Sequence, residues 1–519
     1  MMTASEQTSM TRKELNFAMA AVMLTMFTAV IDQAVMATAL PRAAASLNGF
    51  ARYSWPTTAF ALCSTIATPI LAKLSDQYGR KRVYLFSLFL FLVCAPMSAA
   101  AGRLPLPLDG MGQLIGTRAL LGLANAGIIV VSYTLVADLF TPAGRARREG
   151  IIASVWTLGF IVGPSLGGVL SDRSSWRWAL LASFPLGLAA LVMVRCYLPA
   201  IASRRVRRVI DWPGGALICV WTAPFLISLA RLGETGWSIR TLLAFLSISA
   251  VGFLAFLWTE RRAREPIFVL PLFRDRRIAL VCANLILTGV GLYGNGVYLP
   301  LFLQGVLGWT AANSALIFTP FMLGSILGNV VGGQLLSRTG RCHSAALFVS
   351  GLVAICLFLV SRMDATTTHV LLLSTVSCSG IGFGAVVLTY EVLAQNAAPQ
   401  EHLGVATGYT QFSLALGGTI GLAILGACLL HAYHSYLDPL ITAGTSPELA
   451  RALENPLTLA FQNSGSVARY SQTDPGGRLL VESARSGLQF AVHRVFLVAA
   501  ILAAAAFPLN LFLTKERSR

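Results

Sequence analysis

The sequence predicts an all-α polytopic membrane protein, in which fourteen transmembrane helices form two six-helix bundles with two further helices inserted between them. Three observations lead to this fold class. Of the 519 residues, 55% are hydrophobic and only 12% are charged, whereas about 25% of residues are charged in a soluble globular protein. The hydrophobic residues gather in fourteen runs of about 20 residues, the length at which a helix crosses the bilayer core. A short basic turn also recurs near mid-chain, as expected of two related halves.

The expected spans follow one another with mostly short connections. They are 15–39, 54–74, 83–101, 112–137, 150–170, 177–198, 213–231, 240–259, 278–302, 314–336, 344–362, 369–394, 404–430 and 489–513. The first run is too long for the apolar core of a cleavable signal, so we expect a permanent first span.

These spans divide the chain into parts. They are an N-terminal tail (1–14), a first six-helix bundle (15–198), two inserted helices with their flanking loops (199–277), a second six-helix bundle (278–513) that includes a long loop at 431–488, and a C-terminal tail (514–519).

Basic residues are concentrated in the connections on one side of the predicted bundle, at 73–82, 145–148, 204–208 and 261–277. Because Lys and Arg mark cytoplasmic loops, we expect both termini in the cytoplasm and the protein in the inner (plasma) membrane. The net charge of +17 then reflects topology and contact with anionic membrane lipid. It does not predict nucleic-acid binding, which requires a basic face on a soluble fold.

No disulfide framework, metal site or cofactor site is expected. Eight of the nine cysteines fall within apolar runs or at their ends, and their spacing does not fit zinc ligation. The phosphate-binding pattern GxxxxGK[ST] is missing from the sequence, so energy should come from an ion gradient and no enzymatic activity is predicted.

The recurring turn is the segment "LSDQYGR" (74–80), which aligns with "LLSRTGR" (335–341). The Leu, Gly and Arg positions match, and Ser337 stands where the first copy has Asp76. Secondary transporters are commonly built from such repeated halves, with the substrate site between them near the midplane of the bilayer.

Charged residues inside the predicted spans are candidates for proton coupling. Asp32 lies in span one and Arg118 in span four. An acid at mid-bilayer costs about 2.5–3.5 kcal/mol, so Asp32 should face the protein interior, where Arg118 would be its partner. Protonation of Asp32 would weaken this pair; the alternative is a fixed structural ion pair. Glu391 in span twelve could carry a second proton or bind a cationic substrate, unless it lies in water at the end of the span.

Polar and aromatic residues near these charges are candidates for substrate binding. Asn125 shares a helix face with Arg118, and Gln395 shares one with Glu391. Tyr293, Asn295 and Tyr298 lie in the Gly- and Pro-interrupted segment "GVGLYGNGVYLP", and interrupted spans often form transporter sites. Tyr298 could instead anchor the helix end at the membrane interface.

Four segments together resemble the major facilitator superfamily, and in particular its branch of fourteen-span drug:proton antiporters. They are "AKLSDQYGRKR" (72–82) between spans two and three, "LIGTRALLGLANAG" (114–127), "GFIVGPSLGG" (159–168) and "VIDQAVMATALP" (30–41). The resemblance covers nearly the whole chain. One departure is Leu414, which stands where relatives often have Arg.

The resemblance implies a proton-coupled exporter of hydrophobic or cationic drugs, that is, multidrug efflux leading to antibiotic resistance. It implies that Asp76, Arg80 and Asp138 form a latch between the two halves, with Gly79 allowing the turn; the alternative for this charged turn is a role in topology alone. The expected ligands are a small molecule and protons, and a membrane-fusion or outer-membrane protein is a candidate partner.

The segment "GFIVGPSLGG" also has a structural role of its own. Glycines four residues apart let helices approach closely, and proline bends a helix, so Gly163 and Pro164 should serve conformational gating.

Two rival functions stay open. One is a transporter of the same fold for a specific metabolite, siderophore or lipid. The other is a membrane sensor or scaffold that transports nothing.

Overall fold

The computed structural model describes residues 11–47, 52, 55–140, 142–199, 211–230, 238–263, 266–307, 311–364, 367–437 and 475–513. These residues form helices and their connections, with no β-strand in the described part of the chain. The expected tails at 1–14 and 514–519, the basic residues at 204–208 and most of the loop 431–488 lie wholly or largely outside the described residues.

The first six predicted spans form one half of the molecule, called here the N-lobe. Its helices are α2 (Arg12–Ser46), α3 (Trp55–Tyr78), α4 (Arg80–Ala99), α5 (Gly110–Leu139), α6 (Pro142–Arg173), α7 (Trp176–Leu181) and α8 (Ser183–Tyr197). The sixth span is divided in two because Pro185 has no amide hydrogen for the carbonyl of Leu181, where α7 ends.

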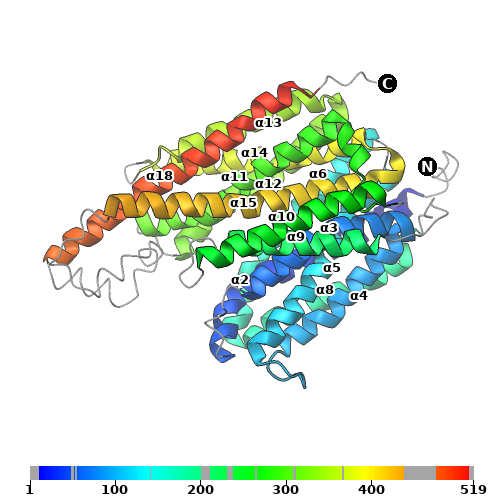
Figure 1. Cartoon of the computed structure of the whole chain (residues 1–519), viewed down its shortest axis with the longest axis horizontal. Coiled ribbons are helices and arrows are strands. Elements are labelled where there is room, and N and C mark those ends of the chain that lie inside the picture. Colours follow the sequence, from blue (N-terminus) through cyan, green and yellow to red (C-terminus); the bar gives the residue numbers. More distant parts are fainter. Residues whose placement is uncertain are drawn as a thin grey trace.

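The second half, called here the C-lobe, contains the last six spans. Its helices are α11 (Arg276–Leu301), α12 (Ala311–Thr339), α13 (Cys342–Val360), α14 (His369–Ala397), α15 (Leu403–Leu437) and α18 (Pro475–Leu511). Three short helical segments accompany them: η2 (Leu270–Arg274) before α11, η3 (Phe302–Val306) after α11, and η4 (Gln400–His402) before α15. The inserted helices α9 (Trp212–Ala230) and α10 (Ile239–Arg262) lie between the lobes in the chain and in Figure 1.

The predicted spans are confirmed by the helices. Among the described residues, thirteen helices are long and apolar enough to cross a membrane, and each matches one expected span. The other expected span, 314–336, lies within α12. The expected loop at 431–488 is shorter than predicted, because α15 continues to Leu437 and α18 already begins at Pro475. Both helices continue through polar residues such as His434 and Arg485, because polarity alone does not end a helix.

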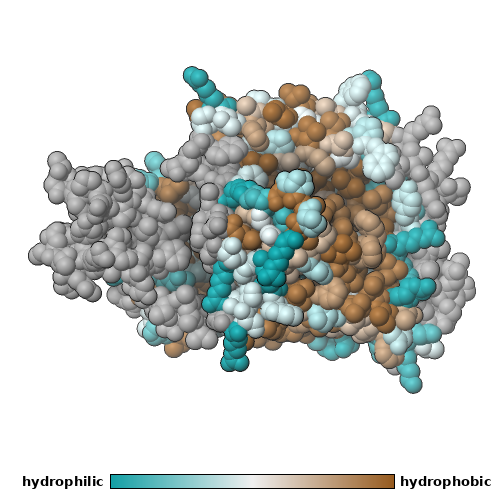
Figure 2. Space-filling model, turned by 90° about the horizontal axis from the view of Figure 1, so that it is seen from below, coloured by the Kyte–Doolittle hydropathy of each residue, from teal (hydrophilic) through white to brown (hydrophobic). Residues whose placement is uncertain are grey.

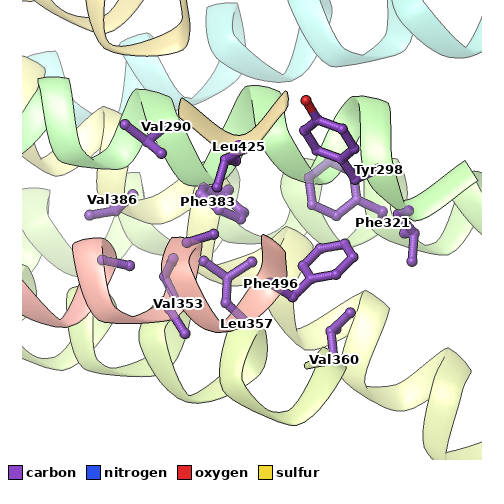
Figure 3. Close-up of a cluster of buried hydrophobic side chains, with 14 of the residues drawn as sticks. Val290, Tyr298, Phe321, Val353, Leu357, Val360, Phe383, Val386, Leu425 and Phe496 are labelled. Carbon is purple, nitrogen blue, oxygen red and sulfur yellow. The ribbon is translucent and has the colours of Figure 1, made fainter. Parts of the chain in front are cut away.

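The two lobes meet along two helix pairs, α6 with α12 and α3 with α15. Each lobe has its own apolar core, and Figure 3 shows the cluster in the C-lobe around Phe383, Leu425 and Phe496. In Figure 1 the C-lobe helices lie above most of the N-lobe helices, with α9 and α10 across the front. The face in Figure 2 carries a broad hydrophobic area with hydrophilic side chains at its right edge and left of its centre, as expected of a protein surrounded by lipid.

Glycines set how closely the helices approach. Within the N-lobe, a side chain at Gly163 of α6 would collide with Ala34 of α2, so the motif around Gly163 and Pro164 packs α6 inside its own lobe. Between the lobes, a side chain at Gly150 would collide with the backbone oxygen of Asn329 on α12. The α6–α12 contact is therefore a close backbone approach that a methyl group would disrupt.

The repeated turn has a glycine with a positive φ at the same position in both lobes. Gly79 has φ +95° and Gly340 has φ +62°, both in the left-handed region that other residues avoid. The two aligned turns therefore share the glycine position, although α4 begins directly after Gly79 and α13 begins at Cys342, two residues after Gly340.

Candidate functional site

A cavity of about 220 Å³ lies between the lobes. Helices α2, α3, α5 and α6 of the N-lobe line one side, and α11, α12, α14 and α15 of the C-lobe line the other. Aromatic side chains form much of the wall; they are Phe60, Tyr133, Trp156, Tyr293 and Phe383. The polar lining includes the amides of Gln33, Asn125, Asn329 and Gln411. The described lining contains no Asp, Glu, Lys or Arg, so the wall is polar in places but carries no charge.

A buried ion pair joins α2 and α5, two of the helices that line this cavity. Arg118 Nη1 on α5 donates to Asp32 Oδ2 on α2 at 2.6 Å, and each side chain is only 1% exposed. Ser183 Oγ on α8 lies 3.5 Å from the other carboxylate oxygen. Gln33, the residue after Asp32, lines the cavity. Both members of the pair belong to the N-lobe, so the prediction that Arg118 pairs with Asp32 agrees with the geometry.

A second charge cluster joins the lobes at the end of the bundle where α3 ends and α15 begins. Arg80 forms ion pairs with Asp76 and with Asp138, and its Nε lies 2.9 Å from Asp138 Oδ2. Asp76 Oδ2 accepts a hydrogen bond from the backbone amide of Val405 at 3.1 Å.

Val405 is in the first turn of α15, so the Asp76 carboxylate meets the positive end of a C-lobe helix dipole. The three residues expected to form the latch are thus together, and Asp76 contacts the C-lobe through the amide of Val405.

Glu391 is buried inside the C-lobe, with 2% of its surface exposed, which excludes a position in water. Its carboxylate accepts three hydrogen bonds, from Gln395 Nε2 at 3.1 Å, Thr410 Oγ1 at 2.7 Å and Gln411 Nε2 at 3.0 Å. Gln411 also lines the cavity, so one side chain connects the buried acid with the space between the lobes.

The structure separates the five predicted substrate-binding residues into two groups. Asn125 and Tyr293 line the cavity. Asn295, Tyr298 and Gln395 are buried and are not part of the described lining. At about 100° per residue, Asn295 and Tyr298 point about 160° and 140° away from Tyr293 around α11.

Tyr298 therefore packs in the C-lobe core, as Figure 3 shows, and its hydroxyl donates to the backbone oxygen of Leu422 at 3.3 Å. Tyr298 thus neither lines the cavity nor anchors the helix end at the membrane surface.

Several residues of the site were missed from the sequence. Trp156, Gln411 and Asn329 line the cavity, but nothing in their local sequence separates a cavity-facing residue from one that packs between helices. Glu149 on α6 is fully buried although it directly follows the basic run at 145–148. The sequence feature that could have identified Glu149 as buried is its spacing from Trp156, because residues seven positions apart share one face of a helix.

The sequence matches the family model of the Major Facilitator Superfamily over residues 22–422.

The chain belongs to the major facilitator superfamily.

It is similar to the "Multidrug transporter protein MdtP" of Bacillus subtilis (strain 168), with 26% identity over 514 residues, which cover 94% of this chain and 91% of that protein. It is also similar to "Multidrug resistance protein 3" of the same organism, with 28% identity over 424 residues, 81% of each chain.

Among solved structures, the human organic anion transporter MFSD10 (TETRAN) has the same fold, with a TM-score of 0.62 at 15% identity and 96% and 99% of the two chains covered. This major facilitator protein is therefore a multi-pass membrane transporter and not an enzyme.

Proposed function

We propose that this transporter exports hydrophobic, cationic compounds in exchange for protons. The observation that carries this proposal is the cavity wall, which combines aromatic faces and amides without a fixed charge among its described residues. Aromatic faces attract organic cations and also provide apolar contact area. Two relatives named as multidrug proteins add support.

The cavity favours a cation over an anion. Leu414 lines it where the resemblance to the antiporter branch leads us to expect Arg, and the buried Glu391 lies one hydrogen bond behind Gln411. An anionic metabolite or siderophore would lose its hydration without gaining a cationic partner from the described lining, and burying an unpaired charge is costly.

The size of the cavity indicates that the lobes must move during transport. Its volume of about 220 Å³ is below the range of about 300–1,000 Å³ that is usual for pockets of drug-sized ligands. A compound of that size therefore requires the lobes to separate on one side, as in alternating access.

Asp32 is proposed as a coupling residue. When its carboxylate takes up a proton, the ion pair with Arg118 is replaced by a weaker neutral contact and the guanidinium loses its counter-charge. The uncompensated cation of Arg118, whose partner Asp32 directly precedes the cavity residue Gln33, then disfavours a cationic substrate. Proton binding and substrate binding thus oppose each other, which is the requirement for exchange.

The proposed orientation places the Asp76–Arg80–Asp138 latch at the cytoplasmic face of the plasma membrane. The basic residues of the short loops support this side, and α2 begins and α18 ends at the same end of the bundle (Figure 1). With the latch closed, the described conformation is then shut toward the cytoplasm.

The test uses everted membrane vesicles with an imposed pH gradient and ethidium as the fluorescent cation. We expect accumulation that collapses when the gradient is dissipated, and Asp32→Asn should abolish accumulation driven by the pH gradient. Asp109→Asn, which changes an exposed carboxylate, is the control and should transport normally. Transport of a single metabolite only, or no flux across a broad panel of cations, would contradict the proposal.

A further inference from the structure

Glu149 is a buried acid that the coupling scheme above does not use. It lies near the start of α6, is 0% exposed, and neither of its carboxyl oxygens has a hydrogen-bond partner among the described residues. The next residue, Gly150, packs against Asn329 of α12, and Gly333 of α12 packs against Ala146. Glu149 therefore lies on the N-lobe side of a close backbone contact between the lobes.

The C-lobe places a second unsatisfied group beside it. Gln395 Nε2 on α14 is occupied by Glu391 Oε1 at 3.1 Å and Thr407 Oγ1 at 3.3 Å, whereas Gln395 Oε1 is buried without a partner. The carboxyl group of Glu149 lies next to the Gln395 side chain and close enough to Glu391 for the two charges to interact. The three side chains form a row across the interface, in the order Glu149, Gln395, Glu391.

The hydrogen-bonding capacity of this row requires one proton. An amide offers donors on one side and an acceptor on the other, and an ionised carboxylate can only accept. Glu391 already accepts from three donors, as an ionised carboxylate does. Gln395 Oε1 is buried without a donor in the described part of the chain, and Glu149, whose own oxygens have no partner there, can donate a hydrogen bond only when it is protonated. If the proton moved to Glu391, a rotated Gln395 amide would satisfy both acids equally well.

The surrounding charges do not remove this requirement. Arg145, one turn before Glu149 on α6, is near enough to interact with it, but its Nη2 donates to the backbone oxygen of Ala137 at 2.8 Å. Tyr133 on α5 lies near both acids and lines the cavity, and Cys282 on α11 lies near Glu391. Two ionised carboxylates in this dry contact would therefore repel each other with one partly engaged cation nearby.

We propose that Glu149 and Glu391, bridged by Gln395, form a proton-binding site that is split between the lobes and closes only while the pair holds one proton. This inference rests on the proposed proton-coupled transport. The pair of Asp32 and Arg118 lies within one lobe and does not sense lobe separation directly. Glu149 does, because separation of α6 from α14 removes its partner. Loss of the shared proton favours opening at the latch end.

The test measures the distance between the lobes against pH without any substrate. Spin labels are attached at Arg82→Cys on α4 and Arg338→Cys on α12, both exposed near the latch end, after the nine native cysteines are replaced by serine or alanine. Double electron–electron resonance in lipid nanodiscs from pH 5 to 9 should show short distances at low pH and a growing population of long distances as the pH rises.

Glu149→Gln supplies a permanent donor to Gln395 and removes the titrating group, so the short distance should persist to at least one pH unit above the wild-type midpoint. Glu391→Gln should also remove the pH response, since a single carboxylate then remains and Gln395 can satisfy it. Glu401→Gln, an exposed acid at the same end, is the matched control and should keep the wild-type profile. Monodisperse size-exclusion profiles establish that the variants are folded, and Glu391→Gln carries the test if Glu149→Gln does not fold.

A wild-type profile in Glu149→Gln, or no pH-dependent distance change in the wild type, would overturn the split site. These results are separate from the vesicle assay. Ethidium exchange that depends on Asp32, together with an unchanged Glu149→Gln profile, refutes this inference alone, whereas absence of flux for every cation contradicts the proposed function.

Discussion

The buried pair of Asp32 and Arg118 gives a quantitative prediction for stability. Both side chains are 1% exposed and lie 2.6 Å apart, so removal of one partner leaves the other charge buried and uncompensated. Such a change costs about 3–5 kcal/mol, whereas replacing both charges together is often close to neutral. We therefore expect Asp32→Asn and Arg118→Gln each to lower the free energy of unfolding by about this amount, and the double variant to lose much less than their sum.

The assay is a double-mutant cycle on protein unfolded by sodium dodecyl sulfate from mixed micelles, followed by tryptophan fluorescence. The coupling energy should be at the upper end of the usual range of about 0.5–3 kcal/mol for contacting residues, or above it. The matched control is the exposed pair of Arg52 and Asp109, with side chains 45% and 55% exposed, where we expect no measurable coupling. Additive losses at Asp32 and Arg118 would refute the reasoning, because they would mean that neither charge depends on the other.

Three further predictions concern the latch and the cavity. Gly404→Ala would place a methyl group 2.5 Å from Asp76 Oδ1 and 2.7 Å from Arg80 Nη1, so it should lengthen the distance between spin labels at positions 82 and 338 at low pH. An unchanged distance would mean that the latch does not hold the two lobes together. Tyr293→Ala should raise the apparent KM for ethidium in vesicles at least several-fold because it removes a cavity wall, whereas Tyr298→Phe should leave it unchanged; the reverse order would show that the cavity is not the substrate site. Gln411→Leu removes a hydrogen-bond donor to Glu391 and an amide from the cavity lining, so it should weaken ethidium binding more than Asn295→Leu does. Equal effects of the two variants would contradict a role for Gln411 in substrate binding.

The positions of the spans were predictable from the sequence because a long apolar run has few alternatives in a bilayer. The pairing of Asp32 with Arg118 was also accessible, since a membrane interior leaves a charge few partners. The three latch residues came from a motif, but the contact from Asp76 to the amide of Val405 joins residues 329 positions apart. No local pattern contains that contact.

The side on which a residue points was harder to predict than the helix that carries it. Tyr293 and Tyr298 are both tyrosines among glycines, yet one lines the cavity and the other packs in the C-lobe core. Helix phase separates them, and the phase of a helix that is apolar on all sides cannot be read from hydropathy. Glu149 was missed for another reason. The basic residues before it suggest, by their composition, that it belongs to a loop, whereas helix α6 already begins at Pro142.

The inserted helices make the two flanks of the molecule unequal. Helix α9 contacts both α3 and α15, and an aromatic group that includes Trp221, Phe268 and Phe412 ties the insertion to the C-lobe. The flank formed by α3 and α15 is thus shielded from lipid, whereas α6 and α12 meet backbone to backbone through Gly150 on the opposite flank. A lipid-dissolved molecule therefore meets the inserted helices on one flank and the close contact between α6 and α12 on the other.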